Sequence, residues 1–165
     1  MAGCRVSRVG DRRGFTLIEL VITVAIVALL ASVALPVSEL AVQRTKEQEL
    51  RRTLRQIREA IDSYKQASDE GLIQKSVGDS GYPKKLEDLA EGVDDQKSAK
   101  KTKIYFLRRI PRDPLNADPT LSAAATWGKR SYASPPDDPR EGDDVFDVFS
   151  LAPGKGINGQ PYRDW

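Results

Sequence analysis

Residues 12–21 read RRGFTLIELV, and here a basic segment gives way to a long apolar one. The apolar run extends from Phe15 to Leu35. As a helix it would measure roughly 30 Å, about the thickness of a bilayer's hydrocarbon core. Glu19 is out of place in such a segment, because a charge at membrane depth costs roughly 2.5–3.5 kcal/mol. We therefore regard Glu19 as a candidate functional residue, the alternative being a side chain that snorkels to the nearby interface.

The region before the apolar run has a strong charge bias. Asp11 is its one acid, against four arginines: Arg5, Arg8, Arg12 and Arg13. Positive charge is retained on the cytoplasmic side of a membrane. The bias therefore predicts a cytoplasmic N-terminus and an extracytoplasmic location for everything after Leu35.

Three interpretations of this region compete. A secretory signal peptide would be cut near Ser32–Ala34, and the paired arginines of DRRGF are typical of a twin-arginine signal. Both predict a soluble exported domain. An acid near the start weakens insertion in either case, and the run is longer than a signal peptide's apolar core of about 7–15 residues. The third interpretation is a retained membrane anchor whose carboxylate is functional.

Composition narrows the classes of function. The 165 residues contain no histidine, which excludes Ser-His-Asp and Cys-His catalysis and histidine metal sites. Cys4 is the only cysteine, so the chain has no internal disulfide. A formal net charge of +2, with acids and bases interleaved, indicates no nucleic-acid partner.

A second helical pattern follows the apolar run. Residues 39–68 are rich in helix formers, and Gly71 is the expected stop. We expect residues 41–48 to face solvent or other subunits. Apolar residues recur at helical spacing at Leu50, Leu54, Ile57, Ile61 and Tyr64. This stripe predicts a helix lying on its own small domain rather than in a short coiled coil.

The remainder of the chain reads as short elements. Residues 81–92 predict a short helix that starts near Pro83 and stops at Gly92. The charged segment 94–103 predicts an exposed loop. Residues 126–134 and 143–151 predict two strands joined by a proline-rich, acidic hairpin loop, and the aromatic side chain of Trp165 is expected to dock on the core.

The quoted stretch resembles the class III signal of type IV pilins and of type II secretion pseudopilins. The resemblance implies that a membrane peptidase cuts between Gly14 and Phe15 and that the same machinery N-methylates Phe15. It places the family's functional glutamate on Glu19 and its helix-perturbing proline on Pro36. A proline there should kink or loosen the helix, because it lacks an amide hydrogen and clashes with the preceding turn.

The resemblance also explains the buried charge. Cleavage creates a positive amine on Phe15, and methylation leaves it basic. A carboxylate in a low-dielectric environment needs a partner. Glu19 of an incoming subunit is thus expected to meet the Phe15 amine of a subunit already in a fibre, which fixes register during assembly.

The rest of the chain resembles the major pseudopilin family of type II secretion, known as general secretion pathway protein G. The resemblance rests on LRRIPRDPLNADP at residues 107–119, on DVFS at 147–150, on a glycine-rich loop and on the final Asp-Trp. It implies an α+β, type IV pilin-like fold: a long N-terminal helix packed on a small domain with a short antiparallel sheet. The expected divisions are a removed leader at 1–14, a transmembrane assembly helix at 15–36, its amphipathic continuation at 37–70 and a periplasmic α+β domain at 71–165.

Calcium is the one cofactor that the resemblance raises. In the family, an aspartate in the loop after the last strand helps to bind calcium, whereas this chain has Pro153, Gly154 and Lys155 there. Calcium needs several oxygen ligands and negative charge, so Lys155 opposes it. The remaining candidate carboxylates are Asp143, Asp144, Asp147 and Asp164, the alternative being that they are solvated or stabilise turns.

The leading hypothesis is a pseudopilin that is cleaved, methylated and polymerised in the bacterial inner membrane, with its domain in the periplasm. The resemblance implies as partners other copies of the chain, minor pseudopilins, an inner-membrane assembly platform and the prepilin peptidase/methylase. A second hypothesis is a minor or adhesive type IV pilin, although many pilins carry a disulfide that residues 15–165 cannot form. A membrane-anchored or exported enzyme is a third, and no nucleophile motif or metal cluster supports it.

Overall fold

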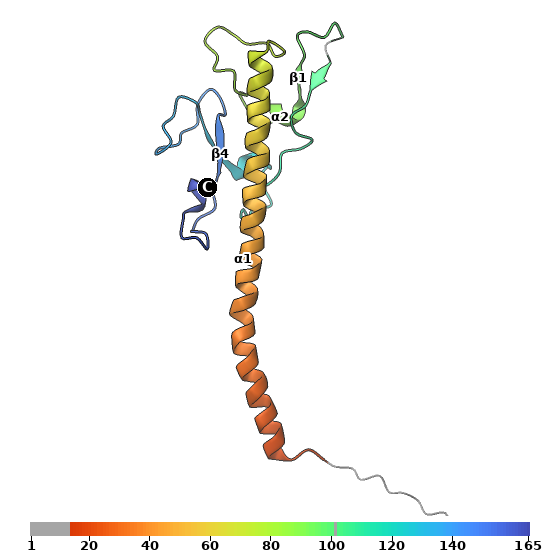
Figure 1. The fold of residues 1–165 in the computed structure, drawn as a ribbon, viewed down its shortest axis with the longest axis vertical. Coiled ribbons are helices and arrows are strands. Elements are labelled where there is room, and N and C mark those ends of the chain that lie inside the picture. Colours follow the sequence, from red (N-terminus) through yellow and green to blue (C-terminus); the bar gives the residue numbers. More distant parts are fainter. Residues whose placement is uncertain (1–13, 101) are drawn as a thin grey trace, which may run out of the picture. The chain divides into compact units, whose positions relative to one another are not determined.

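The computed structural model of the protein describes residues 14–100 and 102–165, without the side chains of residues 33–37. Its longest element is helix α1, Leu17–Asp69, of 53 residues (Figure 1). The chain divides into two compact units, Met1–Ala41 and Val42–Trp165, and α1 contributes residues to both. The predicted helix over residues 39–68 is confirmed. The leader prediction falls mostly on residues 1–13, which lie outside the described residues.

The backbone of α1 stays helical through Pro36. The side chain of Pro36 lies outside the described residues, so the expected kink stays a prediction. β-branched residues are frequent in the first half of α1, and these weaken a helix in water. A helix of this length must therefore draw its stability from tertiary packing or from an apolar environment.

Gly71 ends α1 in the way the sequence predicts. The amide of Leu72 donates to the carbonyl of Ala67 at 2.9 Å, and the amide of Gly71 donates to the carbonyl of Ser68 at 3.1 Å. These are the two hydrogen bonds of a Schellman motif. Gly71 supplies the left-handed backbone that the motif requires, with φ of 74°.

The predicted apolar stripe forms the core of the second unit. Its five side chains are each at most 8% exposed: Leu50, Leu54, Ile57, Ile61 and Tyr64. Leu86, Leu89, Trp127 and Val148 pack in the same cluster. Full burial of one such aliphatic side chain stabilises a fold by about 1.5–3 kcal/mol, so the stripe is what holds the domain to α1.

Strands β3, Trp127–Arg130, and β4, Asp147–Ser150, form an antiparallel pair, as predicted. Gly128 lies opposite Phe149, and a side chain at position 128 would collide with the phenylalanine ring. Val148 and Ser150 are buried, whereas Asp147 and Phe149 are half-buried on the other face. The long segment between the strands is the predicted hairpin loop.

The other elements are short. Helix α2, Asp88–Glu91, is shorter than the predicted helix and begins five residues after Pro83, because residues 84–87 form turns. Gly92 ends it, as expected, with φ of 77°. Strands β1, Val93–Asp94, and β2, Lys103–Ile104, pair antiparallel and were not predicted. Two 3-10 turns, Ala124–Thr126 and Tyr162–Asp164, complete an α+β fold with a long N-terminal helix and small antiparallel sheets.

Candidate functional site

The first turn of α1 has a capping arrangement. The hydroxyl of Thr16 accepts a hydrogen bond from the amide of Glu19 at 3.3 Å. Thr16 is thus the N-cap and Glu19 the third helical residue, the spacing of a capping box. An acid in the first turn also interacts favourably with the helix dipole. The local sequence therefore stabilises a helix start at Leu17 as well as presenting a carboxylate there.

The expected cleavage bond lies outside this helix. Gly14 and Phe15 precede α1 and have no regular secondary structure. Phe15 is 81% exposed, and a side chain added at Gly14 would meet no atom within 4 Å. A non-helical, uncrowded peptide bond of this kind is accessible to a peptidase.

Among the described residues, nothing covers the apolar side chains of the first half of α1. Ten residues between Leu17 and Leu30 are 53–83% exposed, all of them Leu, Ile or Val. A continuous apolar surface of this size marks a surface that another molecule covers. No helix among the described residues meets the length and apolarity required to cross a bilayer.

A buried carboxylate on α1 fastens the C-terminal segment in the second unit. Glu47 is only 5% exposed. Its Oε1 accepts hydrogen bonds from the amide of Ile157 at 2.9 Å, from the hydroxyl of Tyr162 at 3.0 Å and from Nε2 of Gln43 at 3.0 Å. The expectation that residues 41–48 face solvent or other subunits is therefore wrong at Glu47. The physical reason is that three donors satisfy the buried acid.

Tyr162 is held in its neutral form by this environment. Burial is the largest effect and raises the pKa of its hydroxyl; the hydrogen bond from Gln43 lowers the pKa by less, and the neighbouring Glu47 carboxylate raises it. Packing adds to the attachment, since the Tyr162 and Trp165 rings meet edge to face at 5.2 Å. Trp165 packs against the core, as predicted.

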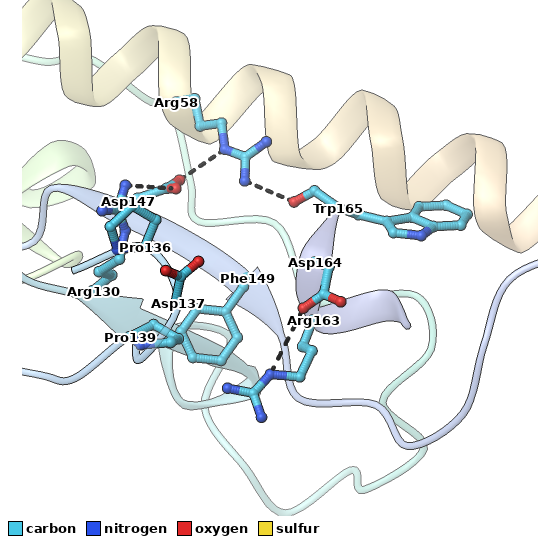
Figure 2. A pocket seen from close by; sticks show the side chains of 10 residues that line it. All are labelled: Arg58, Arg130, Pro136, Asp137, Pro139, Asp147, Phe149, Arg163, Asp164 and Trp165. Atoms are coloured by element: carbon cyan, nitrogen blue, oxygen red, sulfur yellow. Dashed lines mark hydrogen bonds and ion pairs between the residues drawn. The ribbon is translucent and has the colours of Figure 1, made fainter. Parts of the chain in front are cut away.

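An open cleft of about 840 Å³ lies beside this attachment (Figure 2). Arg58 of α1 donates to Oδ1 of Asp147 at 2.7 Å and to the backbone oxygen of Trp165 at 2.8 Å. Arg130 approaches Oδ2 of Asp147 at 3.4 Å, and Arg163 approaches Asp164 at 3.9 Å. Arg58 thereby joins strand β4 and the C-terminal segment to the same helix.

The four candidate calcium ligands do not come together. Asp147 has an arginine on each carboxylate oxygen, and Asp164 faces Arg163. Asp143 lies near Asp144 in a different hollow. Among the described residues, no three acids, cysteines or histidines are placed to hold a metal ion. The donor set does not fit calcium, because two arginines already neutralise Asp147 and the four carboxylates do not converge on one point.

Asp144 instead stabilises a turn. It accepts hydrogen bonds from the hydroxyl of Ser131 at 2.7 Å and from the amide of Tyr132 at 2.9 Å. Burial works against its charge, but hydrogen bonds from Ser80, Tyr132 and Ser131 together outweigh burial and hold the pKa of Asp144 below its usual value. The turn-stabilising alternative is the one that fits this aspartate.

The sequence interpretation missed Glu47, Arg58 and the role of Tyr162. A signal for Glu47 was present, because it stands three residues before Leu50 and so continues the buried stripe. Nothing local marks Arg58, whose acceptors are 89 and 107 residues away along the chain.

Comparison with known proteins gives one result. Residues 10–35 match the family model of the prokaryotic N-terminal methylation motif. Neither a curated protein nor a solved structure matches the chain significantly. The match covers the basic segment, the expected cleavage bond, Glu19 and the first turns of α1. Residues 10–35 therefore carry a prepilin-type methylation signal, the signal of type IV pilin-like proteins.

Proposed function

We propose that this chain is a pseudopilin of a type II secretion system. It is cut between Gly14 and Phe15, N-methylated on Phe15 and polymerised into a short periplasmic fibre that drives protein export. The observation that carries the proposal is that the methylation motif runs directly into a helix whose apolar side chains are uncovered. Before assembly the inner membrane covers these side chains, and within the fibre the helices of other copies cover them.

Glu19 supplies register in this proposal. Its capped position places the carboxylate at a fixed point of the first turn, three residues after the N-cap. The amine of Phe15 on a neighbouring copy compensates the carboxylate in an environment without water. Minor pseudopilins, the inner-membrane platform and the peptidase/methylase are the other partners. The general secretion pathway protein G resemblance and the cysteine-free residues 15–165 favour this function over a minor or adhesive pilin.

Mass spectrometry of the mature N-terminus tests the processing step. The chain is expressed with a prepilin peptidase and a secretion apparatus, and the membrane fraction is analysed. We expect a chain that starts at methylated Phe15. A retained leader, or a chain that starts near Leu35, would contradict the proposal.

Substitution of Glu19 tests the assembly step. Glu19→Ala should leave cleavage and methylation intact but abolish fibres, because breaking a buried ion pair costs about 3–5 kcal/mol. Since about 1.4 kcal/mol corresponds to a tenfold change, the association constant between copies should fall by more than about a hundredfold. The matched control is Glu39→Ala, another exposed acid on α1. Fibre yield and export of a reporter exoprotein are measured together, and normal yield for Glu19→Ala would contradict the role of Glu19.

A further inference from the structure

The exposed face of α1 in the second unit carries a line of arginines. Arg44, Gln48, Arg52 and Arg55 follow one another at spacings of four, four and three residues, so they share one face of the helix. All four are exposed. The buried stripe at Leu50, Leu54 and Ile57 occupies a different face. We call Arg44, Arg52 and Arg55 the basic stripe.

The basic stripe has no charge partner of its own. Within residues 14–100 and 102–165, none of its guanidinium groups takes part in a hydrogen bond or an ion pair. The neighbouring arginines differ, since Arg51 lies over the Trp165 ring at 4.3 Å and Arg58 binds Asp147. Arg52 and Arg55 are three residues apart and repel each other, and neither Glu49 nor Glu59 at the neighbouring helix positions forms an ion pair with them among the described residues. This face is therefore suited to an acidic partner surface.

The same unit presents a surface of the opposite character. A hollow of about 370 Å³ is lined by Tyr82 and Tyr132 and by three carboxylates, those of Asp79, Asp143 and Asp144. We call these five residues the aromatic hollow. The two rings stack at 5.7 Å, and Tyr132 is 62% exposed. Lys84 partly offsets the charge by approaching Asp79 at 3.7 Å.

Two features of the hollow suit a guanidinium. Asp143 has no hydrogen bond or ion pair to any residue in the described parts of the chain. The exposed face of Tyr132 is available for a cation, and in the same cluster Lys65 already lies 5.6 Å from the Tyr82 ring. Arginine both stacks on aromatic rings and pairs with carboxylates, which makes it the cation of choice for such a site.

We propose that the basic stripe of one copy docks on the aromatic hollow of a second copy. The inference rests on the proposed function and specifies a contact within its polymer. Two different patches meet, so the interface is heterologous and can continue from copy to copy along a filament. Charge complementarity of this kind fixes register and suppresses wrong partners.

Disulfide trapping between full-length chains in detergent tests the contact. Cys4→Ser removes the native thiol from every chain. Gln48→Cys places a thiol within the basic stripe, and Ala133→Cys places one at the hollow; both positions are exposed and uncharged, so the fold is retained. The control pair combines Gln48→Cys with Lys97→Cys, on the exposed β1–β2 loop.

We expect the Gln48→Cys and Ala133→Cys chains to form a mixed dimer at least about tenfold faster than the control pair. The rate should fall to the control level in 1 M salt, where the Debye length is about 3 Å. Equal rates for the two pairs, or a predominant Gln48→Cys homodimer, would overturn the proposal.

A charge swap then identifies the residues. Arg55→Glu should reduce the mixed dimer at least about tenfold, and Asp143→Arg on the other chain should restore it. Loss without restoration would overturn the assignment of Asp143. Because trapping uses unprocessed chains in detergent, it is independent of the Phe15 mass measurement, so failure of this contact and failure of the proposed function are separate results.

Discussion

At the scale of single residues, Thr16 and Glu19 have a structural role besides any role in assembly. The Thr16 hydroxyl satisfies the Glu19 amide, and the Glu19 carboxylate lies in the first turn of α1. A negative charge there stabilises a helix by about 0.3–1 kcal/mol. Replacing Glu19 therefore weakens the helix start slightly as well as removing a charge. The two effects are separated by a substitution that removes the cap alone.

Thr16→Ala is that substitution. It removes the acceptor for the Glu19 amide and should destabilise the first turn by about 1 kcal/mol. Hydrogen exchange of the Glu19 amide in the full chain should then become roughly fivefold faster. Thr16→Ser keeps the hydroxyl and should exchange like the native chain. Unchanged exchange in Thr16→Ala would mean that the cap does not hold the turn.

At the scale of elements, the boundary of α1 depends on one glycine. Gly71 has a left-handed backbone, and a Cβ there would meet no atom within 4 Å. The residue is therefore required for its backbone conformation and not for space. This separates it from Gly128, where a side chain would collide with Phe149.

Gly71→Ala should accordingly destabilise the second unit by about 1 kcal/mol, the penalty of a left-handed conformation for a residue with a Cβ. Gly71→Asn should cost less, because asparagine tolerates this conformation. Denaturant unfolding of the full chain, followed by tryptophan fluorescence, measures both. Equal loss for the two variants would contradict the requirement for a left-handed backbone at this position.

Local patterns predicted the elements that a repeating spacing of apolar residues marks. The spacing from Leu50 to Tyr64 gave the buried face of α1, and alternation gave the β3–β4 pair. Strands β1 and β2 have two residues each and lie in a charged segment, so no periodicity marks them. In the candidate site, the sequence pattern points to Gly14, Phe15 and Glu19, and residues 10–35 match the methylation motif, while the roles of these three residues stay predictions. The attachment at Glu47 could not be predicted in full, because its donor Tyr162 lies 115 residues away.

At the scale of the whole molecule, α1 holds the C-terminal segment through two of its own side chains. Glu47 and Arg58 bind atoms of Ile157, Tyr162, Asp147 and Trp165. A tight turn between Gly156 and Gln160 shapes the segment, with the Gly156 amide donating to the Gln160 carbonyl at 2.8 Å. The beginning and the end of the second unit's sequence are thus held together by these contacts.

The stability that this attachment confers should fall at alkaline pH. The raised pKa of Tyr162 means that the unfolded chain loses the phenolic proton first, at about pH 10. The associated stability is therefore complete below pH 10 and is lost as the pH rises through the higher pKa of the folded state. Tyr162→Phe cannot ionise, so the free energy of unfolding of the native chain should fall towards that of Tyr162→Phe as the pH rises above about 10.

The comparison with Tyr162→Phe also cancels the other tyrosines with raised pKa values, Tyr64 and Tyr82, because both chains contain them. The measurement is denaturant unfolding of both full chains at a series of pH values. A stability difference that stays constant over this range would show that Tyr162 is not held neutral by its surroundings.

The Glu47 attachment has a consequence for the order of events during synthesis. The ribosome makes Glu47 more than one hundred residues before its donors Ile157 and Tyr162. Until these arrive, the Glu47 carboxylate lacks two of its three hydrogen-bond donors, and contacts of such long sequence separation form late. The nascent or translocating chain therefore passes through a stage in which the face of α1 around Glu47 is open to misassociation. A chaperone would protect the chain most during that stage.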